Sequence, residues 1–290
     1  MAARETPAND ADQPLSAIVA RDVERALAED TGSGDLTAQL IDASLPGRAR
    51  VICRDDAVLA GVPWLDACFR ALDPAVAIDW QVPEGGRLAP DATACVIQGQ
   101  ARALLTAERQ ALNFLQTLSA VATRTRMFVE AVAGTSAKIV DTRKTLPGLR
   151  YAQKYAVRIG GGTNHRMGLY DGILIKENHI AAAGGVRAAL EAARRVDARV
   201  PVQIEVETLE QLQEALAAGA KLVLLDNFTT DRMREAVKLS AGRAELEASG
   251  GIDLKTVRAI AETGVHRISI GGLTKDVKAV DFSMRLALVA

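Results

Sequence analysis

The sequence is most unusual between Asp141 and Lys176, where seven basic side chains face only two acidic ones. The basic residues are Arg143, Lys144, Arg150, Lys154, Arg158, Arg166 and Lys176. The whole chain has a net charge of −1, so this surplus is local. The segment is rich in glycine and lies between apolar stretches, unlike a disordered basic tail. Because Arg binds carboxylates through two parallel hydrogen bonds and Lys acts as a point charge, the segment predicts a pocket for a small, multiply charged anion.

Acidic residues and glycine-rich turns end four later apolar stretches. Glu205 lies in PVQIEVE and Asp226 ends KLVLLD, while two other stretches end in SGG at 249–251 and IGG at 270–272. Carboxylates suit ribose hydroxyls or a Mg²⁺ ion that bridges to a pyrophosphate. Backbone N–H groups in glycine-rich turns can hold phosphate oxygens, although ordinary strand-to-helix turns are the alternative. Together with the basic segment, these groups predict chemistry on a phosphorylated sugar.

Short apolar strands that alternate with helices must position these groups. Six strands are visible: AKIVD, GILIK, PVQIEVE, KLVLLD, AELEASGG and HRISIGG, and the stretch between Met127 and Gly172 has room for one or two more. Helical stretches between them include GVRAALEAARRV, TLEQLQEALAAG and DLKTVRAIAETG. Such alternation implies right-handed crossovers and a parallel sheet. We expect a closed or nearly closed β/α barrel, with its chemistry at the carboxyl ends of the strands. An open doubly wound sheet is the alternative.

The first part of the chain, about 110 residues, has a different pattern. A helix is expected at 17–29, and short strands at 48–55, 57–61, 77–85 and 93–100, which together form an α+β layer. A long amphipathic helix is expected to begin at Thr106, whose hydroxyl is a candidate N-cap. We place the domain boundary near the start of that helix.

Composition excludes several classes of protein. Apolar residues make up 49% of the chain, enough for a large core. A net charge of −1 argues against binding nucleic acid or a membrane surface, and no apolar run reaches the roughly 18 residues of a membrane span. The first residues lack the apolar core of a secretory signal. Cys53, Cys68 and Cys95 are odd in number and widely spaced, so we expect reduced, buried thiols in a cytoplasmic protein.

Several long motifs identify a resemblance to the quinolinate phosphoribosyltransferase family, the carboxylating nicotinate-nucleotide pyrophosphorylases of NAD biosynthesis. These motifs are EDTGSGDLT, ERQALNFLQTLSAVAT, DTRKTLPGLR, KYAVRIGGGTNHRMGLYDGILIKENH, IEVE, LLDNF, EASGGI and ISIGGLT. They follow one another along nearly the whole chain. The resemblance implies an N-terminal α/β sandwich at residues 1–112, joined by a C-terminal return at 275–290. An incomplete, TIM-like β/α barrel is then expected at 113–274.

The resemblance also implies the reaction and its partners. Quinolinate would react with 5-phosphoribosyl 1-pyrophosphate and Mg²⁺ to give nicotinate mononucleotide, pyrophosphate and CO₂. The expected assembly is a homodimer whose active site is shared between subunits, and a hexamer is left open. A relative with an altered substrate, or a non-catalytic phosphosugar-binding protein, are the alternatives.

Residue roles follow from the matching positions. Arg143, His165, Arg166 and Lys176 resemble the clamp for quinolinate, with Thr142 and Lys144 beside them. Arg109 resembles an arginine that crosses the dimer interface. Glu205 and Asp226 resemble the residues that face the ribose hydroxyls and the magnesium, directly or through the substrate. Five residues resemble the turns that hold the 5-phosphate: Ser249, Gly250, Gly251, Ser269 and Gly271.

The implied chemistry depends on charge. The sugar C1 becomes positive as pyrophosphate leaves, and nearby carboxylates can stabilise that charge. The pyridine nitrogen attacks C1, and the resulting ring cation accepts the electrons left by CO₂. Lys144, Glu205 and Asp226 are the candidate catalytic residues, and either Lys144 or His165 could deliver the proton that replaces CO₂.

Overall fold

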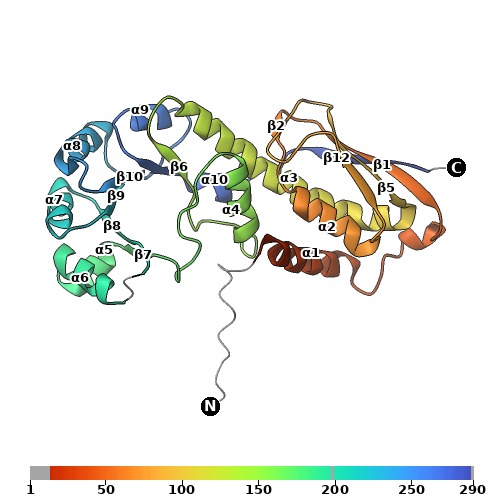
Figure 1. Cartoon of the computed structure of the whole chain (residues 1–290), viewed down its shortest axis with the longest axis horizontal. Coiled ribbons are helices and arrows are strands. Elements are labelled where there is room, and N and C mark those ends of the chain that lie inside the picture. Colours follow the sequence, from red (N-terminus) through yellow and green to blue (C-terminus); the bar gives the residue numbers. More distant parts are fainter. Residues whose placement is uncertain (1–13, 197–198, 289–290) are drawn as a thin grey trace, which may run out of the picture. The chain divides into compact units, whose positions relative to one another are not determined.

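The computed structural model describes residues 14–196 and 199–288, which form two compact units (Figure 1). Unit 1 takes its residues from three parts of the sequence, 1–123, 147–160 and 276–290, and unit 2 from 124–146 and 161–275. The division lies within helix α3 (Ala101–Ala131), whereas the boundary expected from the sequence is at residue 112. Hydrogen bonds explain why the division lies after residue 123. Ser119 Oγ and Thr123 Oγ1 of α3 accept hydrogen bonds from the backbone N–H groups of Ala60 and Val58, which attaches this part of α3 to unit 1.

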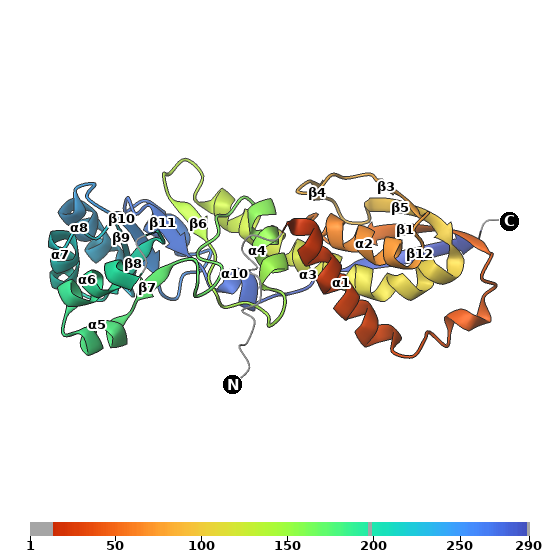
Figure 2. The same ribbon diagram turned by 60° about the horizontal axis from the view of Figure 1, so that its bottom comes forward.

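Unit 1 is built on a four-stranded antiparallel sheet of order β12-β1-β5-β3. Its strands are β1 (Pro46–Cys53), β3 (Ala77–Trp80), β5 (Thr93–Gln100) and β12 (Phe282–Leu288). Strand β12 comes from the end of the described chain and pairs with β1 along seven residues, so that Arg50 lies opposite Arg285 (Figure 2). The expected return of the C-terminal segment to the first domain is therefore confirmed.

Helices α1 (Leu15–Thr31), α2 (Val62–Leu72) and α4 (Arg150–Ile159) complete unit 1 with the first part of α3, the short strands β2 (Ala57–Val58) and β4 (Arg87–Leu88), and the 3₁₀ turn η2 (Ala38–Leu40). The expectation that Thr106 begins α3 is wrong. The helix starts at Ala101, and the Thr106 hydroxyl donates to the Arg102 carbonyl one turn earlier and to Asp35 Oδ2.

Polar contacts attach α4 to unit 1. Glu84 accepts hydrogen bonds from the backbone N–H groups of Gly61 and Val62 at the start of α2, and a third from the Tyr155 hydroxyl of α4. The Tyr155 ring meets the fully buried Trp64 edge to face, with 5.1 Å between ring centroids. Trp64 therefore has a packing role in unit 1. Lys154 of α4 is also fully buried.

Unit 2 contains six parallel strands in the order β6-β11-β10-β9-β8-β7. These are β6 (Lys138–Val140), β7 (Ile173–Ile175), β8 (Val202–Val206), β9 (Leu222–Asp226), β10 (Glu245–Ser249) and β11 (Arg267–Ser269). The six expected strands are thus confirmed. Between Met127 and Gly172 the described chain adds only an isolated parallel bridge from Val140 to Thr163.

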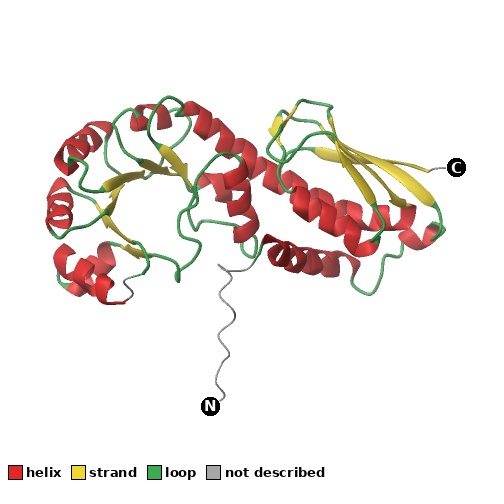
Figure 3. Ribbon diagram, in the orientation of Figure 1, coloured by secondary structure: helices red, strands yellow, loops and turns green. Residues whose placement is uncertain are grey.

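The six strands form the inside of an incomplete barrel. Figure 3 shows them as an inner arc, with the helices that connect them on the outer side. Helices on one face distinguish this arrangement from a doubly wound sheet, which has helices on both faces. The connecting helices are α5 (Glu177–Ala183), α6 (Val186–Val196), α7 (Leu209–Ala217), α8 (Thr230–Ser240) and α9 (Val257–Ala261). The short helix α10 (Gly272–Lys275) follows β11.

Two further expectations concern the described residues as a whole. Cys53, Cys68 and Cys95 are all buried and free, as expected. Burial raises the pKa of all three thiols, so they stay protonated at neutral pH. None of the described helices is long and apolar enough to cross a membrane.

Candidate active site

Residues from the carboxyl ends of the barrel strands line a cavity of about 250 Å³ in unit 2, which we call the barrel cavity. Nine of the predicted site residues line it: Thr142, Arg143, Lys144, His165, Arg166, Lys176, Glu205, Ser249 and Ser269. Glu247, Leu174 and Leu224 complete the wall. Side chains two positions apart on a strand share a face. This spacing explains why alternate strand residues reach the cavity.

The cationic side of the barrel cavity depends on two aspartates that anchor its loops. Asp141, which is fully buried, accepts hydrogen bonds from the backbone N–H of His165 at 2.8 Å and from Asn164 Nδ2. Asp171 accepts from the backbone N–H groups of Met167 and Gly168. These bonds fix the loop that follows the Thr163 bridge. They thereby position His165 and Arg166 at the cavity.

Arg166 carries much of the positive charge of this side. Its Nη1 donates to the Gly172 carbonyl at 2.9 Å, which orients the guanidinium. Burial lowers the Arg166 pKa, and the charge of nearby Arg143 lowers it further. The Arg166 guanidinium stays charged at neutral pH, since arginine is ordinarily protonated throughout the physiological range. Two adjacent positive charges that repel each other form a site that an anion would stabilise.

The acidic side of the cavity lies at the ends of β8 and β9. Glu205 Oε2 is 3.7 Å from Lys176 Nζ, and Asp226 accepts a hydrogen bond from Asn227 Nδ2. The Glu205 pKa is raised mainly by burial, opposed by Lys176 and raised further by the charge of Asp226. Asp226 therefore acts electrostatically on Glu205. Glu207 lies beyond the end of β8 and is exposed, which supports Glu205 as the inward carboxylate.

At this site a metal ion would be held partly by protein carboxylates and partly by the substrate to which it is bound. Oxygen donors such as the carboxylates of Glu205 and Asp226 are those that Mg²⁺ prefers. No cluster of three or more Asp, Glu, His or Cys side chains suited to a metal occurs in the described part of the chain. The residues thus fit a Mg²⁺ that arrives bound to phosphate oxygens, rather than one enclosed by protein ligands.

The glycine turn after β10 has a backbone that needs glycine, unlike the turn after β11. Gly250 has φ +107° and Gly251 has φ +56°, both in the left-handed region. A Cβ at Gly250 would lie 2.1 Å from Asn227 Oδ1, and one at Gly271 would lie 3.0 Å from Lys144 Cδ. The space beside Gly250 is thus filled by Asn227 and that beside Gly271 by Lys144, whereas no atom lies within 4 Å of a Cβ at Gly251. The backbone at Gly251 is therefore open to a phosphate held by N–H groups.

Five predicted residues are not among those that line the barrel cavity: Asp226, Gly250, Gly251, Gly271 and Arg109. Arg109 is the only one of the five that lies in unit 1. It is exposed on α3 within unit 1 and is not among the residues that line the cavity of unit 2. His179 has a capping role, because its Nδ1 accepts from the backbone N–H of Lys176 at the start of α5.

Three polar residues around the site were not predicted from the sequence: Asp141, Gln203 and Glu247. Gln203 and Glu247 are 5% and 1% exposed, and each precedes a predicted residue by two positions, at Glu205 and Ser249. The two-residue period of a strand could have indicated them. Asp141 could be identified only from the fold, because its partners are more than twenty residues away in sequence.

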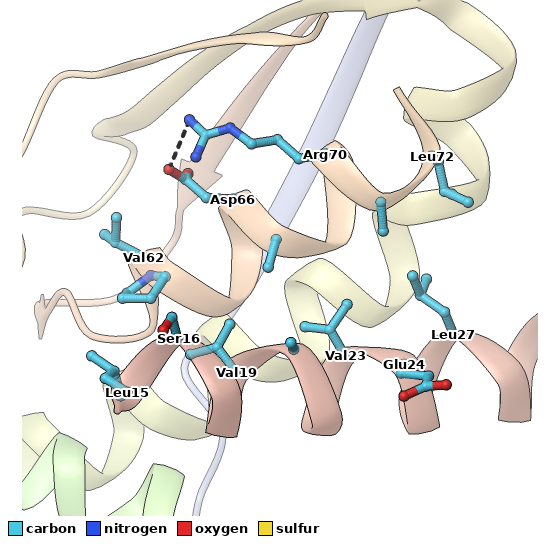
Figure 4. A pocket seen from close by; sticks show the side chains of 14 residues that line it. Leu15, Ser16, Val19, Val23, Glu24, Leu27, Val62, Asp66, Arg70 and Leu72 are labelled. Carbon is cyan, nitrogen blue, oxygen red and sulfur yellow. Dashed lines mark ion pairs between the residues drawn. The ribbon is translucent and has the colours of Figure 1, made fainter. Parts of the chain in front are cut away.

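A larger cavity of about 950 Å³ lies between α1 and α2 within unit 1 (Figure 4). Its wall is mostly apolar and includes Val19, Val23 and Val62, with an ion pair of 3.3 Å between Asp66 and Arg70. None of the predicted site residues lines it. Its composition suits hydrophobic packing rather than chemistry on an anion.

The fold is an incomplete parallel β/α barrel, and one mouth of it has a cationic wall, an acidic pair and glycine turns. This combination defines a class of enzyme that acts on phosphorylated, multiply anionic substrates. The N-terminal and C-terminal domain models of quinolinate phosphoribosyl transferase match residues 35–119 and 121–285. The chain belongs to the quinolinate phosphoribosyltransferase family.

Individual relatives agree with this assignment. The chain is 44% identical to a probable carboxylating nicotinate-nucleotide pyrophosphorylase of Bacillus subtilis, over 90% of each sequence. It is also 44% identical to the carboxylating nicotinate-nucleotide pyrophosphorylase of Mycobacterium leprae, over 92% of this chain and 97% of that protein. The structure of the Francisella tularensis nicotinate-nucleotide pyrophosphorylase superposes with a TM-score of 0.91 at 42% identity, covering 95% of this chain and 98% of that one.

Proposed function

We propose that this protein transfers the phosphoribosyl group of 5-phosphoribosyl 1-pyrophosphate to quinolinate, with loss of CO₂, to give nicotinate mononucleotide and pyrophosphate. The observation that carries the proposal is the pairing of opposite charges in one cavity. Arg143, Arg166 and Lys176 line it with Glu205. The carboxylates of quinolinate need the three cationic side chains. The ribose of 5-phosphoribosyl 1-pyrophosphate needs Glu205.

Quinolinate binding is assigned to the cationic side. Its two carboxylates would pair with Arg143, Arg166 and Lys176, and the planar guanidinium groups can each make two parallel hydrogen bonds. Thr142 and His165 border the same wall. Arg109 would come from a second subunit. In a homodimer with a shared active site, each subunit can supply a residue that the cavity of the other subunit lacks.

The phosphorylated sugar is assigned to the remaining wall. The backbone N–H groups of Gly250, Gly251 and Gly271 would hold the 5-phosphate, with the hydroxyls of Ser249 and Ser269 beside them. Glu205 and Asp226 would accept hydrogen bonds from the ribose hydroxyls and share Mg²⁺ with the pyrophosphate. When bound, that ion would neutralise charge on the leaving pyrophosphate.

Positioning and electrostatics carry the rate in this mechanism. The C1–oxygen bond to pyrophosphate breaks, and positive charge develops on C1 opposite the carboxylates of Glu205 and Asp226. The pyridine nitrogen, held by the cationic wall, forms the new bond to C1. Loss of the 2-carboxylate as CO₂ then leaves an electron pair on the ring carbon, stabilised by the adjacent ring cation. A proton from either Lys144 or His165 completes nicotinate mononucleotide.

We also propose that the enzyme works as a homodimer in the cytoplasm. Three free, buried thiols suit a reducing compartment. A shared active site accounts for the position of Arg109 in unit 1.

The test is to incubate the purified protein with quinolinate, 5-phosphoribosyl 1-pyrophosphate and Mg²⁺, and to measure nicotinate mononucleotide and CO₂. Both products should form in equal amounts. Nicotinate in place of quinolinate is the matched control, because it lacks the carboxylate that is lost. Absence of both products above a blank without enzyme would contradict the proposal.

A further inference from the structure

A chain of buried hydrogen bonds leads away from His165 into the barrel interior. Nε2 of His165 lies 2.8 Å from Gln203 Oε1, and Gln203 Nε2 donates to Glu247 Oε2 at 3.1 Å. Gln203 and Glu247 come from β8 and β10, which lie on either side of β9 in the sheet. Neither residue belongs to the binding roles described above. We call the sequence from His165 through Gln203 to Glu247 the His165 relay.

The partner of the other ring nitrogen fixes the protonation of His165. The backbone N–H of Arg166 donates to His165 Nδ1 at 2.7 Å. A nitrogen that accepts a hydrogen bond carries no proton, so the ring is neutral and its proton is on Nε2. Nε2–H then donates to Gln203 Oε1, which leaves the Gln203 amide nitrogen as donor to Glu247. Each donor in the relay meets an acceptor.

Arg267 supports the far end of the relay. Glu247 is almost completely buried, and its Oε1 has no hydrogen-bond partner among the described residues, although it lies 3.8 Å from His165 Nε2. Arg267 Nε lies 3.0 Å from Glu247 Oε2, close enough for an ion pair although its N–H does not point at the oxygen. The two residues are direct neighbours across β10 and β11. A buried carboxylate is costly without a counter-charge, and Arg267 supplies one beside Glu247.

We propose that Gln203 and Glu247 are positioning residues that hold His165 as a neutral imidazole with its proton on Nε2. This inference rests on the proposed function, because it assigns the relay to quinolinate binding. Both ring nitrogens are committed to partners within the protein, so His165 delivers no proton to the product. Of the two candidate donors, Lys144 remains. The relay also orients Arg166, whose backbone N–H is bonded to the same ring.

Nitrogen-15 NMR of the free protein tests the tautomer without any activity. The chain has three histidines, His165, His179 and His266, and the backbone N–H of Leu246 donates to His266 Nδ1 as that of Lys176 does to His179. Selective labelling of histidine should therefore give three pairs of ring-nitrogen signals, one pair for each imidazole. In every pair, Nδ1 should be unprotonated. His165→Gln identifies the pair of interest. A protonated Nδ1 on His165 in the unsubstituted protein would overturn the inference.

Gln203→Met removes both amide functions while nearly conserving volume. The ring signals of His165 should change while those of His179 and His266 stay the same. The KM for quinolinate should rise about threefold to tenfold, the range that corresponds to one hydrogen bond. The KM for the pyrophosphorylated sugar should not change. Equal rises in both KM values, or unchanged His165 signals, would contradict a positioning role.

Glu247→Gln provides a conservative variant that keeps an acceptor oxygen for Gln203. It should retain the His165 tautomer, and loss of that tautomer would show that the charge of Glu247, not the relay geometry, controls the ring. That result would overturn the inference. Glu245→Gln, two residues earlier on the same strand and exposed, is the matched control and should leave spectra and kinetics unchanged. If the protein makes no nicotinate mononucleotide, the proposed function fails, yet the NMR result still decides the tautomer.

Discussion

Lys176 Nζ and Glu205 Oε2 lie 3.7 Å apart where β7 and β8 end, and they join the cationic and acidic sides of the barrel cavity. The pair is partly exposed, so its contribution to stability is small. Its importance is in placing a positive and a negative charge where two anionic substrates of different shape must meet.

Glu205→Gln should reduce kcat about a hundredfold, because it removes a fixed negative charge opposite the developing positive charge on C1. The KM for quinolinate should change little. Steady-state kinetics with each substrate varied in turn would measure both effects. Glu207→Gln is the matched control, since Glu207 lies two residues further on and outside the cavity. A similar loss in both variants would argue for a general charge effect rather than a role of Glu205.

The pH dependence of activity should reflect the raised pKa of Glu205. Burial is the main cause of that shift above the usual value of 4.5, and Lys176 opposes it. Glu205 must be ionised to stabilise C1, so activity should fall as the pH drops through the raised pKa. The acid limb should therefore lie above pH 4.5. Lys176→Met removes the opposing charge and should move the limb to higher pH in a profile of kcat/KM. A limb that stays in place would show that another group controls it.

Arg166→Ala should raise the KM for quinolinate about a hundredfold or more, because a carboxylate would lose charge-assisted hydrogen bonds in a partly buried cavity. Isothermal titration with quinolinate would give the same loss as a change in Kd. Arg158→Ala changes an exposed arginine of α4 and should leave binding unaffected. Unchanged quinolinate binding in Arg166→Ala would remove this residue from the clamp.

Gly250→Ala combines two penalties. A non-glycine residue in the left-handed region costs about 1–2 kcal/mol, and the new Cβ would also collide with Asn227 Oδ1. We expect a lower Tm and a rise in the KM for the pyrophosphorylated sugar. Gly242→Ala is the control, with φ +75° and no atom within 4 Å of its Cβ. It should lower the Tm alone. A KM effect of the same size in Gly242→Ala would point to general destabilisation.

Complementation between subunits tests the proposed role of Arg109. Arg109→Ala and Lys144→Ala should each be nearly inactive alone. After subunit exchange, a mixed dimer would contain one intact site, and random pairing should restore about a quarter of full activity. Mass spectrometry of the intact dimers would verify the exchange. Mixed dimers without activity would place Arg109 outside the shared site.

The strands of the barrel could be predicted from the sequence because each is a short apolar run that ends in a polar residue or glycine. That same pattern is enough to indicate Glu205, Asp226 and the two glycine turns. Lys154 could not be placed, because a helix of mixed polarity does not reveal which face the rest of the unit covers. Gln203 and Glu247 were missed for a related reason. A buried polar residue is satisfied by partners on other strands, and only the register of β8, β10 and β11 brings those partners together.

The pairing of β12 with β1 has a consequence for how the protein is made. Synthesis starts at the N-terminus, so β1 emerges more than 200 residues before β12. Until residue 288 has been synthesised, β1 is an unprotected sheet edge, the kind of surface that other chains can join. Most of unit 2, at 161–275, can fold before that point. Unit 1 therefore cannot complete its sheet until β12 has been made, and its open edge is exposed to aggregation during that interval.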